Sequence, residues 1–210
     1  MHYPAAPWHL QGYAIQTLHW LDIDRVRPTI PAALSIVPLF PGKTLGSVYI
    51  ATYSPGSSLE YNELIVVSGL VYHGHQWGAW ISHIYVDDPR SVQGGRELWG
   101  LPKEMAQFTW QHDNQLSVQV RQGDRHLCSL QGHPRLPGIR LPIAAPIMSQ
   151  IQAQFCMFTG QGTLNWHLIS SHLEVTNDSP FSSLGLGQGW LAWYSNPLSL
   201  TINSPMTDSG

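Results

Sequence analysis

Hydrophobic and polar residues alternate along most of the chain, in short stretches bounded by glycine and proline. The 16 prolines and 19 glycines disfavour long helices. Period-two alternation with β-branched and aromatic residues is typical of half-buried strands. The strands expected from this pattern cover residues 13–20, 47–53, 63–72, 77–86, 106–112, 115–121, 125–131, 150–158, 164–175 and 189–194. The pattern therefore predicts a mostly β protein.

Helices and turns fill the remaining stretches. Asp22 is a suitable N-cap for a short helix that stops at Pro28. Residues 94–100 predict one to two helical turns. QHDNQ and RQGDR separate successive strands and indicate hairpin turns, whereas the proline-rich segment 133–146 indicates a long extended connection. We expect one domain over residues 1–210, an antiparallel barrel-like or sandwich-like β structure with a few short helices.

Charge excludes several classes of partner. Charged residues make up 11% of the chain, the net charge is −3, and no lysine or arginine cluster occurs. The electrostatic footprint for nucleic acid or an anionic membrane is therefore missing. The N-terminal stretch lacks the pattern of a signal peptide, and no apolar run approaches the ~20 residues of a membrane helix. Cys128 and Cys156 could pair, but free buried thiols in a cytoplasmic protein are the favoured interpretation.

Motifs for common cofactors fail on their spacing. FPGKTLG (40–46) lacks the first glycine of a phosphate loop, and GLGQG (185–189) lacks the third glycine of a dinucleotide site. His73 and His75 would share one face of a strand, with His83 eight residues further on, but no carboxylate lies nearby in the sequence. We therefore expect neither a cofactor nor a bound metal.

Lysine occurs only twice, as Lys43 and Lys103, and Lys103 lies in the stretch GGRELWGLPKEMA (94–106). This stretch resembles the active-site signature of the acetoacetate decarboxylase superfamily. The matching residues are Gly95, Arg96, Glu97, Pro102, Lys103 and Ala106. The resemblance extends over about residues 6–130 and includes YNELIVVSGL, which is similar to a family strand that carries a glutamate.

The resemblance implies a β-rich cone or barrel with an apolar pocket, assembled into homo-oligomers. It implies that Lys103 forms a Schiff base with a ketone or keto acid and that Glu63, rather than Glu60, is the pocket glutamate. A lysine amine attacks a carbonyl only when neutral, and desolvation disfavours the charged form; acetoacetate decarboxylase is itself the standard example of a lysine activated in this way. The resulting iminium accepts electrons and so favours decarboxylation, aldol addition or dehydration.

Three departures from the family pattern bear on the reaction. The decarboxylases carry a second lysine where this chain has Glu104, and a carboxylate beside an amine favours its charged form. The expected substrate-binding arginine on the first strand is replaced by Gly12 or Tyr13, and the chain is shorter. We include Glu104 among the residues that could tune catalysis.

A second branch, plant proteins linked to neoxanthin formation, is also similar. The shared string consists of Gly100, Leu101, Pro102, Ala106 and Phe108. This likeness implies an alternative function, a non-Schiff-base protein that binds or processes an apolar ligand related to isoprenoids or carotenoids.

For other residues of the signature, a role in the fold is an alternative to a role in the site. Trp99, Leu101 and Met105 either line a substrate pocket or pack in the core. We expect Arg96 and Glu97 to form a buried or half-buried ion pair that holds the turn. Glu63 either faces the pocket or is a strand-edge charge in solvent.

Overall fold

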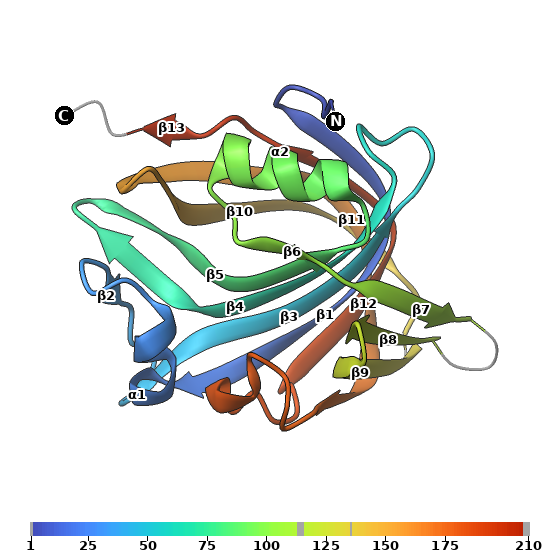
Figure 1. The fold of residues 1–210 in the computed structure, drawn as a ribbon. Coiled ribbons are helices and arrows are strands. Elements are labelled where there is room, and N and C mark those ends of the chain that lie inside the picture. The colour runs from blue at the N-terminus through green and yellow to red at the C-terminus, as the bar shows by residue number, and fades with distance from the viewer. Residues whose placement is uncertain (1, 113–115, 135, 208–210) are drawn as a thin grey trace.

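The protein is built almost entirely from antiparallel strands (Figure 1). The computed structural model describes residues 2–112, 116–134 and 136–207. The strands are β1 (Trp8–Asp22), β2 (Ser35–Ile36), β3 (Lys43–Tyr53), β4 (Tyr61–His73), β5 (Gln76–Val86), β6 (Lys103–Met105), β7 (Gln107–Gln111), β8 (Leu116–Gln122), β9 (Arg125–Pro134), β10 (Ile139–Ile151), β11 (Gln154–Val175), β12 (Leu191–Ile202) and β13 (Met206–Thr207). The helices are α1 (Ile23–Val26), η1 (Arg27–Thr29), α2 (Pro89–Trp99) and η2 (Ser182–Leu184). The predicted mostly-β class with a few short helices is confirmed.

The strands follow the order β10-β5-β4-β3-β1-β12-β11-β9-β8-β7. β10 also pairs with β11, so the pairings from β10 through β5, β4, β3, β1, β12 and β11 return to β10. The sheet is strongly curved, and α2 and β6 pack against β5 (Figure 1). Alternate residues of each strand face the enclosed space, because successive side chains point to opposite faces.

The buried residues form two clusters. One lies around Trp8, Trp99 and Phe158, where β1 and β11 meet α2. The other joins β1, β3 and β4 to the β8–β9 hairpin and η2, and includes Cys128. Cys128 and Cys156 are both buried and free, as expected from the absence of redox spacing. No helix in the described part of the chain is long and apolar enough to cross a membrane.

Two predictions about secondary structure are wrong. The extended connection expected at 133–146 is in large part strand β10, whose pairing with β11 begins at Ile139. The strand expected at 150–158 is interrupted by a hairpin turn at Gln152 and Ala153, which both have positive φ. Proline lacks a donor N–H, so the prolines of β10 made a paired strand resemble a loop.

Of the other predictions on turns and helices, two are confirmed, one lies outside the described residues and one needs a new helix start. The short helix after Asp22 is present, and RQGDR forms a hairpin turn with Gly123 at φ 58°. The turn expected at QHDNQ includes residues 113–115, which lie outside the described residues. The helix expected at 94–100 begins earlier, at Pro89, because Asp88 caps it by accepting a hydrogen bond from the Arg90 backbone N–H.

Candidate active site

Helix α2 carries one wall of the candidate site. Pro89 occupies its first turn, and Gly100 ends it in the left-handed conformation at φ 63°. The helix spacing places Ser91 and Gly95 four residues apart and therefore on one face. Both are buried, and this face is turned to strand β6.

Two glycines allow the helix to approach its neighbours closely. A Cβ atom at Gly95 would lie 2.4 Å from Cδ of Lys103, and one at Gly94 would lie 2.7 Å from a ring carbon of Trp8. Glycine inside a helix costs roughly 1 kcal/mol relative to alanine. Here the missing side chains make the space through which the stem of Lys103 runs, which explains the double glycine of the motif.

Strand β6 directs the lysine inward and its neighbour outward. Lys103 is buried, whereas Glu104 is exposed and accepts a hydrogen bond of 2.7 Å from Nε2 of Gln122. Arg96 donates from Nε to the carbonyl oxygen of Lys103 at 2.8 Å, which ties the strand to α2. The carboxylate that replaces the second lysine of the decarboxylases therefore points away from the site.

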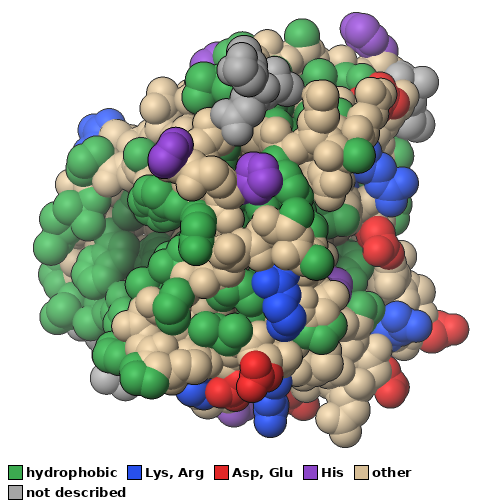
Figure 2. Space-filling view, turned by 90° about the vertical axis from the view of Figure 1, so that its left-hand side faces the viewer, with side chains coloured by type: hydrophobic (Ala, Val, Ile, Leu, Met, Phe, Trp, Pro, Cys, Tyr) green, Lys and Arg blue, Asp and Glu red, His purple; other side chains and the backbone are tan. Residues whose placement is uncertain are grey.

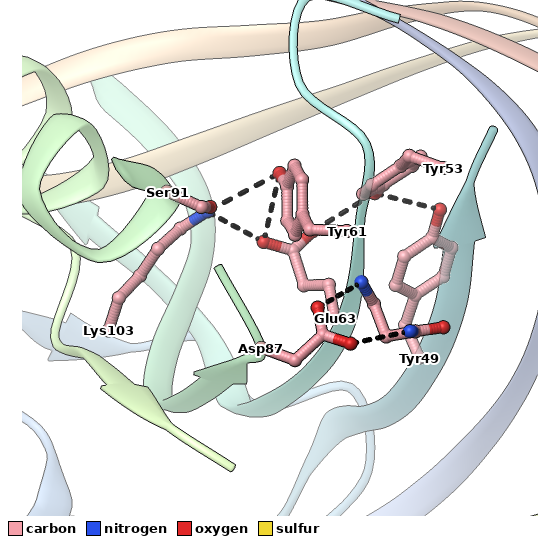
Figure 3. A network of polar contacts seen from close by, with 8 residues as sticks. Tyr49, Tyr53, Tyr61, Glu63, Asp87, Ser91 and Lys103 are labelled. Carbon is pink, nitrogen blue, oxygen red and sulfur yellow. Dashed lines mark hydrogen bonds and ion pairs between the residues drawn. The ribbon is translucent and has the colours of Figure 1, made fainter. Parts of the chain in front are cut away.

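The amine of Lys103 lies in a closed polar cluster (Figure 3). Its Nζ donates to Oε1 of Glu63 at 2.8 Å and to Oγ of Ser91 at 2.9 Å. The two charged side chains are only 4% and 5% exposed. The rings of Tyr61 and Trp8 lie 5.0 Å and 5.6 Å from the nitrogen, within range for cation–π attraction. The two charged groups are thus almost completely removed from bulk water.

Two further tyrosines extend the cluster from Glu63 (Figure 3). Tyr53 donates its hydroxyl hydrogen to Oε2 of Glu63 at 3.0 Å, and the hydroxyls of Tyr49 and Tyr53 are 3.2 Å apart. Burial, and secondly the negative charge of Glu63, raise the pKa of Tyr53 and of Tyr61 well above the ordinary value. These hydroxyls therefore stay protonated and act as donors to the carboxylate.

Asn62 holds the start of β4 from the opposite side of the strand. Its backbone N–H donates to Asp87 at 2.7 Å and its side-chain amide donates to the same carboxylate at 2.6 Å. Its side-chain oxygen Oδ1 accepts hydrogen bonds from the Thr52 hydroxyl and from the indole N–H of Trp110. These four contacts orient the strand so that the next residue, Glu63, faces Lys103.

A small cavity of about 50 Å³ adjoins the amine. Trp99 and Leu101 line it, together with Lys103 and Glu63. A larger cavity of about 300 Å³ lies beyond Glu63. The two share five residues, which are Glu63, Ile65, Ile81, Ile147 and Ile202. The Lys103 amine and the Glu63 carboxylate thus lie at the inner end of a mostly apolar space.

Some residues expected at the site are placed elsewhere. Met105 is 44% exposed and lines neither cavity. Glu60, the glutamate not favoured for the pocket, is exposed, in agreement with the choice of Glu63. The ion pair expected between Arg96 and Glu97 is wrong. Both side chains are exposed, and Glu97 instead accepts hydrogen bonds from Tyr3 and Gln93. Adjacent helix positions point in different directions, so the two charges do not face each other.

Other residues of the site were not assigned from the sequence. Ser91, Tyr53 and Trp8 all contact Lys103 or Glu63. Ser91 and Trp8 reach the lysine from other elements, so only the fold shows their proximity. The place of Tyr61 could have been predicted from the sequence, because it lies two residues before Glu63 on the same strand and therefore shares its face.

His73 and His83, two of the three histidines considered as metal ligands, are far apart, and His75 lies in the hairpin turn between β4 and β5 and not on a strand with His73. His73 pairs with Gln76 at the end of the β4–β5 hairpin, whereas His83 pairs with Val66. His73 lies seven positions after Val66 on β4, which corresponds to roughly 20 Å along the strand. No group of three potential ligands occurs within the described ranges.

Comparison with known proteins places this geometry in a family. The sequence profile described as acetoacetate decarboxylase matches residues 2–184. Protein NEOXANTHIN-DEFICIENT 1 of Solanum lycopersicum is 32% identical over 107 residues, which is 51% of this chain and 36% of the relative. Acetoacetate decarboxylase of Burkholderia ambifaria is 35% identical over 89 residues, 42% of this chain and 34% of the relative. The matched stretch thus spans only about a third of these curated relatives.

Solved structures extend the likeness to the whole fold. Acetoacetate decarboxylase from Legionella pneumophila superposes with a TM-score of 0.78 at 16% identity, over 99% of this chain and 89% of that one. The enduracididine biosynthesis enzyme MppR superposes with a TM-score of 0.68 at 13% identity, over 100% of this chain and 89% of that one. From the profile match and this fold, the chain belongs to the acetoacetate decarboxylase family.

Proposed function

We propose that this protein is a lyase that forms a Schiff base between Lys103 and a ketone or keto acid. The observation that carries the proposal is the buried Lys103 amine, 2.8 Å from the Glu63 carboxylate and beside a small cavity. An isolated structural ion pair needs no adjoining space. A nucleophile needs both a proton acceptor and room for the carbonyl carbon.

The first steps follow from the contacts. The ammonium of Lys103 passes one proton to Oε1 of Glu63, and the neutral amine attacks the carbonyl carbon. A proton moves from nitrogen to the new alkoxide, which gives a carbinolamine. Glu63 then returns its proton to the hydroxyl, water leaves, and the nitrogen lone pair forms the iminium. The products are an iminium, a carboxylate and one water, so atoms and charge balance.

The iminium can then react in more than one way. The regenerated Glu63 carboxylate can remove a proton from the α carbon, giving an enamine that enters aldol or dehydration chemistry. Loss of CO2 from a β-keto acid gives the same enamine. A structure of MppR contains the condensation product of pyruvate and imidazole 4-carboxaldehyde, which supports carbonyl condensation on this fold.

The test is reductive trapping. The protein is incubated with a panel of ketones and keto acids, reduced with cyanoborohydride, and digested for mass spectrometry. We expect a secondary-amine adduct on Lys103, none on Lys43, and none in Lys103→Met. Absence of an adduct on Lys103 across the panel, with the folded state retained, would overturn the proposal.

The alternative function is binding of an apolar ligand without covalent chemistry. The observation that favours it is the larger cavity, whose walls are mostly apolar. In that case an apolar ligand co-purifies with the protein and remains bound in Lys103→Met. Assembly into homo-oligomers and a cytoplasmic location also stay predictions; the mass of the native assembly, measured by light scattering, tests the first.

A further inference from the structure

The larger cavity is elongated along the strands. Its wall on β4 runs from Glu63 to Leu70, and its wall on β3 runs from Tyr53 to Leu45. Seven or eight strand residues correspond to roughly 20 Å or slightly more. The volume of about 300 Å³ is at the lower end of ordinary ligand sites, so the space is long and narrow.

The chemistry of the walls changes from one end to the other. Near the lysine, the cavity carries Glu63 and the hydroxyls of Tyr49 and Tyr53. Beyond them the wall is formed mainly by aliphatic side chains, among them Leu18, Leu45, Ile65, Val67, Ile143 and Ile147. Such a wall stabilises an apolar chain by removing its methylene groups from water.

Glu63 and Lys103 are the only charged residues that line the two cavities in the described part of the chain. Each already pairs with the other. A substrate carboxylate would therefore be buried without an arginine or lysine of its own, and burial of an unpaired charge is costly. The lack of a cation for a substrate carboxylate agrees with the sequence of β1, which carries Gly12 and Tyr13 where the family resemblance led us to expect a substrate-binding arginine.

The far end of the cavity reaches the surface. Trp77 lines it and is 56% exposed. Leu141, on the neighbouring strand β10, is 41% exposed. Hydrophobic side chains surround a hollow on the face shown in the space-filling view (Figure 2). An apolar chain can therefore enter from solvent past these hydrophobic side chains.

We propose that the substrate is a neutral carbonyl compound with a long apolar tail. Its carbonyl group lies in the small cavity at Lys103, and its tail extends past Glu63 and Ile65 toward Trp77. This inference rests on the proposed Schiff-base chemistry and narrows it. Aldol or dehydration steps on an enamine fit a neutral substrate, whereas decarboxylation requires the carboxylate that the cavity does not accommodate.

The test uses 2-alkanones of increasing length, from acetone to 2-undecanone, with acetoacetate as the short anionic comparison. The readout is the ketone concentration that gives half-maximal cyanoborohydride trapping on Lys103. We expect this concentration to fall about three- to four-fold per methylene until the cavity is filled, and acetoacetate to trap no better than acetone. A flat series, or preferential trapping of acetoacetate, would overturn the inference.

Two adjacent alanines of β10 give matched variants. Ala145 lines the cavity, whereas Ala144 is exposed and lines neither cavity. Ala145→Trp is expected to abolish the dependence on chain length, and Ala144→Trp is expected to retain it. Equal slopes in both variants would show that the tail does not lie in this cavity.

Tryptophan fluorescence quenching by the same alkanones separates the two proposals. Tight, length-dependent binding without any trapped adduct would refute the Schiff-base reaction but keep the apolar tail site. Trapping without length dependence would refute the tail site and keep the reaction.

Discussion

The two lysines of the chain form ion pairs of almost the same length in opposite environments. Lys43 Nζ lies 2.7 Å from Asp22, and the two side chains are 39% and 47% exposed. Lys103 Nζ lies 2.8 Å from Glu63, and those side chains are 4% and 5% exposed. Both pairs join a strand lysine to a carboxylate of another strand, Asp22 at the end of β1 and Glu63 on β4. Of the two pairs, Lys103 and Glu63 line the small cavity described above.

The comparison shows that contact distance alone does not identify a reactive lysine. An exposed pair is surrounded by water and contributes little, because solvent and salt screen it. A buried pair has lost its hydration and needs additional hydrogen bonds, which Ser91 and Tyr53 supply here.

The largest expected effect comes from removing the proton acceptor. Glu63→Gln retains the shape of the side chain but not its basicity, so the rate of reductive trapping should fall about 10²- to 10⁴-fold. Asp22→Asn, the equivalent change in the exposed pair, should leave the rate unchanged. The rate is measured with one ketone at saturating concentration, and equal rates in wild type and Glu63→Gln would show that Glu63 moves no proton.

The second effect is on stability. Lys103→Met leaves a buried carboxylate without its partner, which should lower the free energy of unfolding by about 3–5 kcal/mol. The double variant Glu63→Gln/Lys103→Met removes both charges and should recover most of this loss. Urea unfolding of wild type, the two single variants and the double variant measures it. A double variant as unstable as the sum of its single changes would mean that the charges do not interact.

The third effect concerns the space that holds the lysine stem. In Gly95→Ala the new Cβ would meet Cδ of Lys103 at 2.4 Å, so the stem must move. We expect a loss of about 1–3 kcal/mol from overpacking and slower trapping. Gly69→Ala is the control, because its Cβ would contact Thr44 at 3.0 Å, away from the site. Slower trapping in both variants would point to general destabilisation instead.

The alternation of residues was sufficient to predict most strands, but it left the direction of Glu63 open, and only the family resemblance pointed to the pocket. Lys103 was found because lysine is scarce and its flanking residues match a family signature. The turn of Glu104 away from the site depends on β6 pairing with β5, which no local pattern records. Ser91 and Trp8 meet the amine only after α2 packs on β1 and β6, so their roles required the tertiary structure.

β10 shows the opposite limit, where a local rule gave the wrong answer. Pro142 and Pro146 pair with Thr163 and Thr159 in the ladder with β11. Proline cannot donate a ladder hydrogen bond, so a proline-rich segment was expected to be unpaired. The ladder with β11 nevertheless continues through both prolines, from Ile139 to Ile151. The cavity wall formed by Ile143, Ala145 and Ile147 was therefore not foreseen.

The smallest effect is expected at the exposed pair. The hydrogen bond from Lys43, the largest cause, holds the pKa of Asp22 below its ordinary value. A lowered carboxyl pKa stabilises the fold above the unfolded value near 3.8 and loses that contribution as the pH falls through the folded value. Lys43→Met should therefore shift the urea midpoint slightly at neutral pH and low salt, and not at all in acid or high salt. A shift that persists at high salt would mean that Lys43 stabilises the fold by packing and not by charge, which would remove the contrast with Lys103.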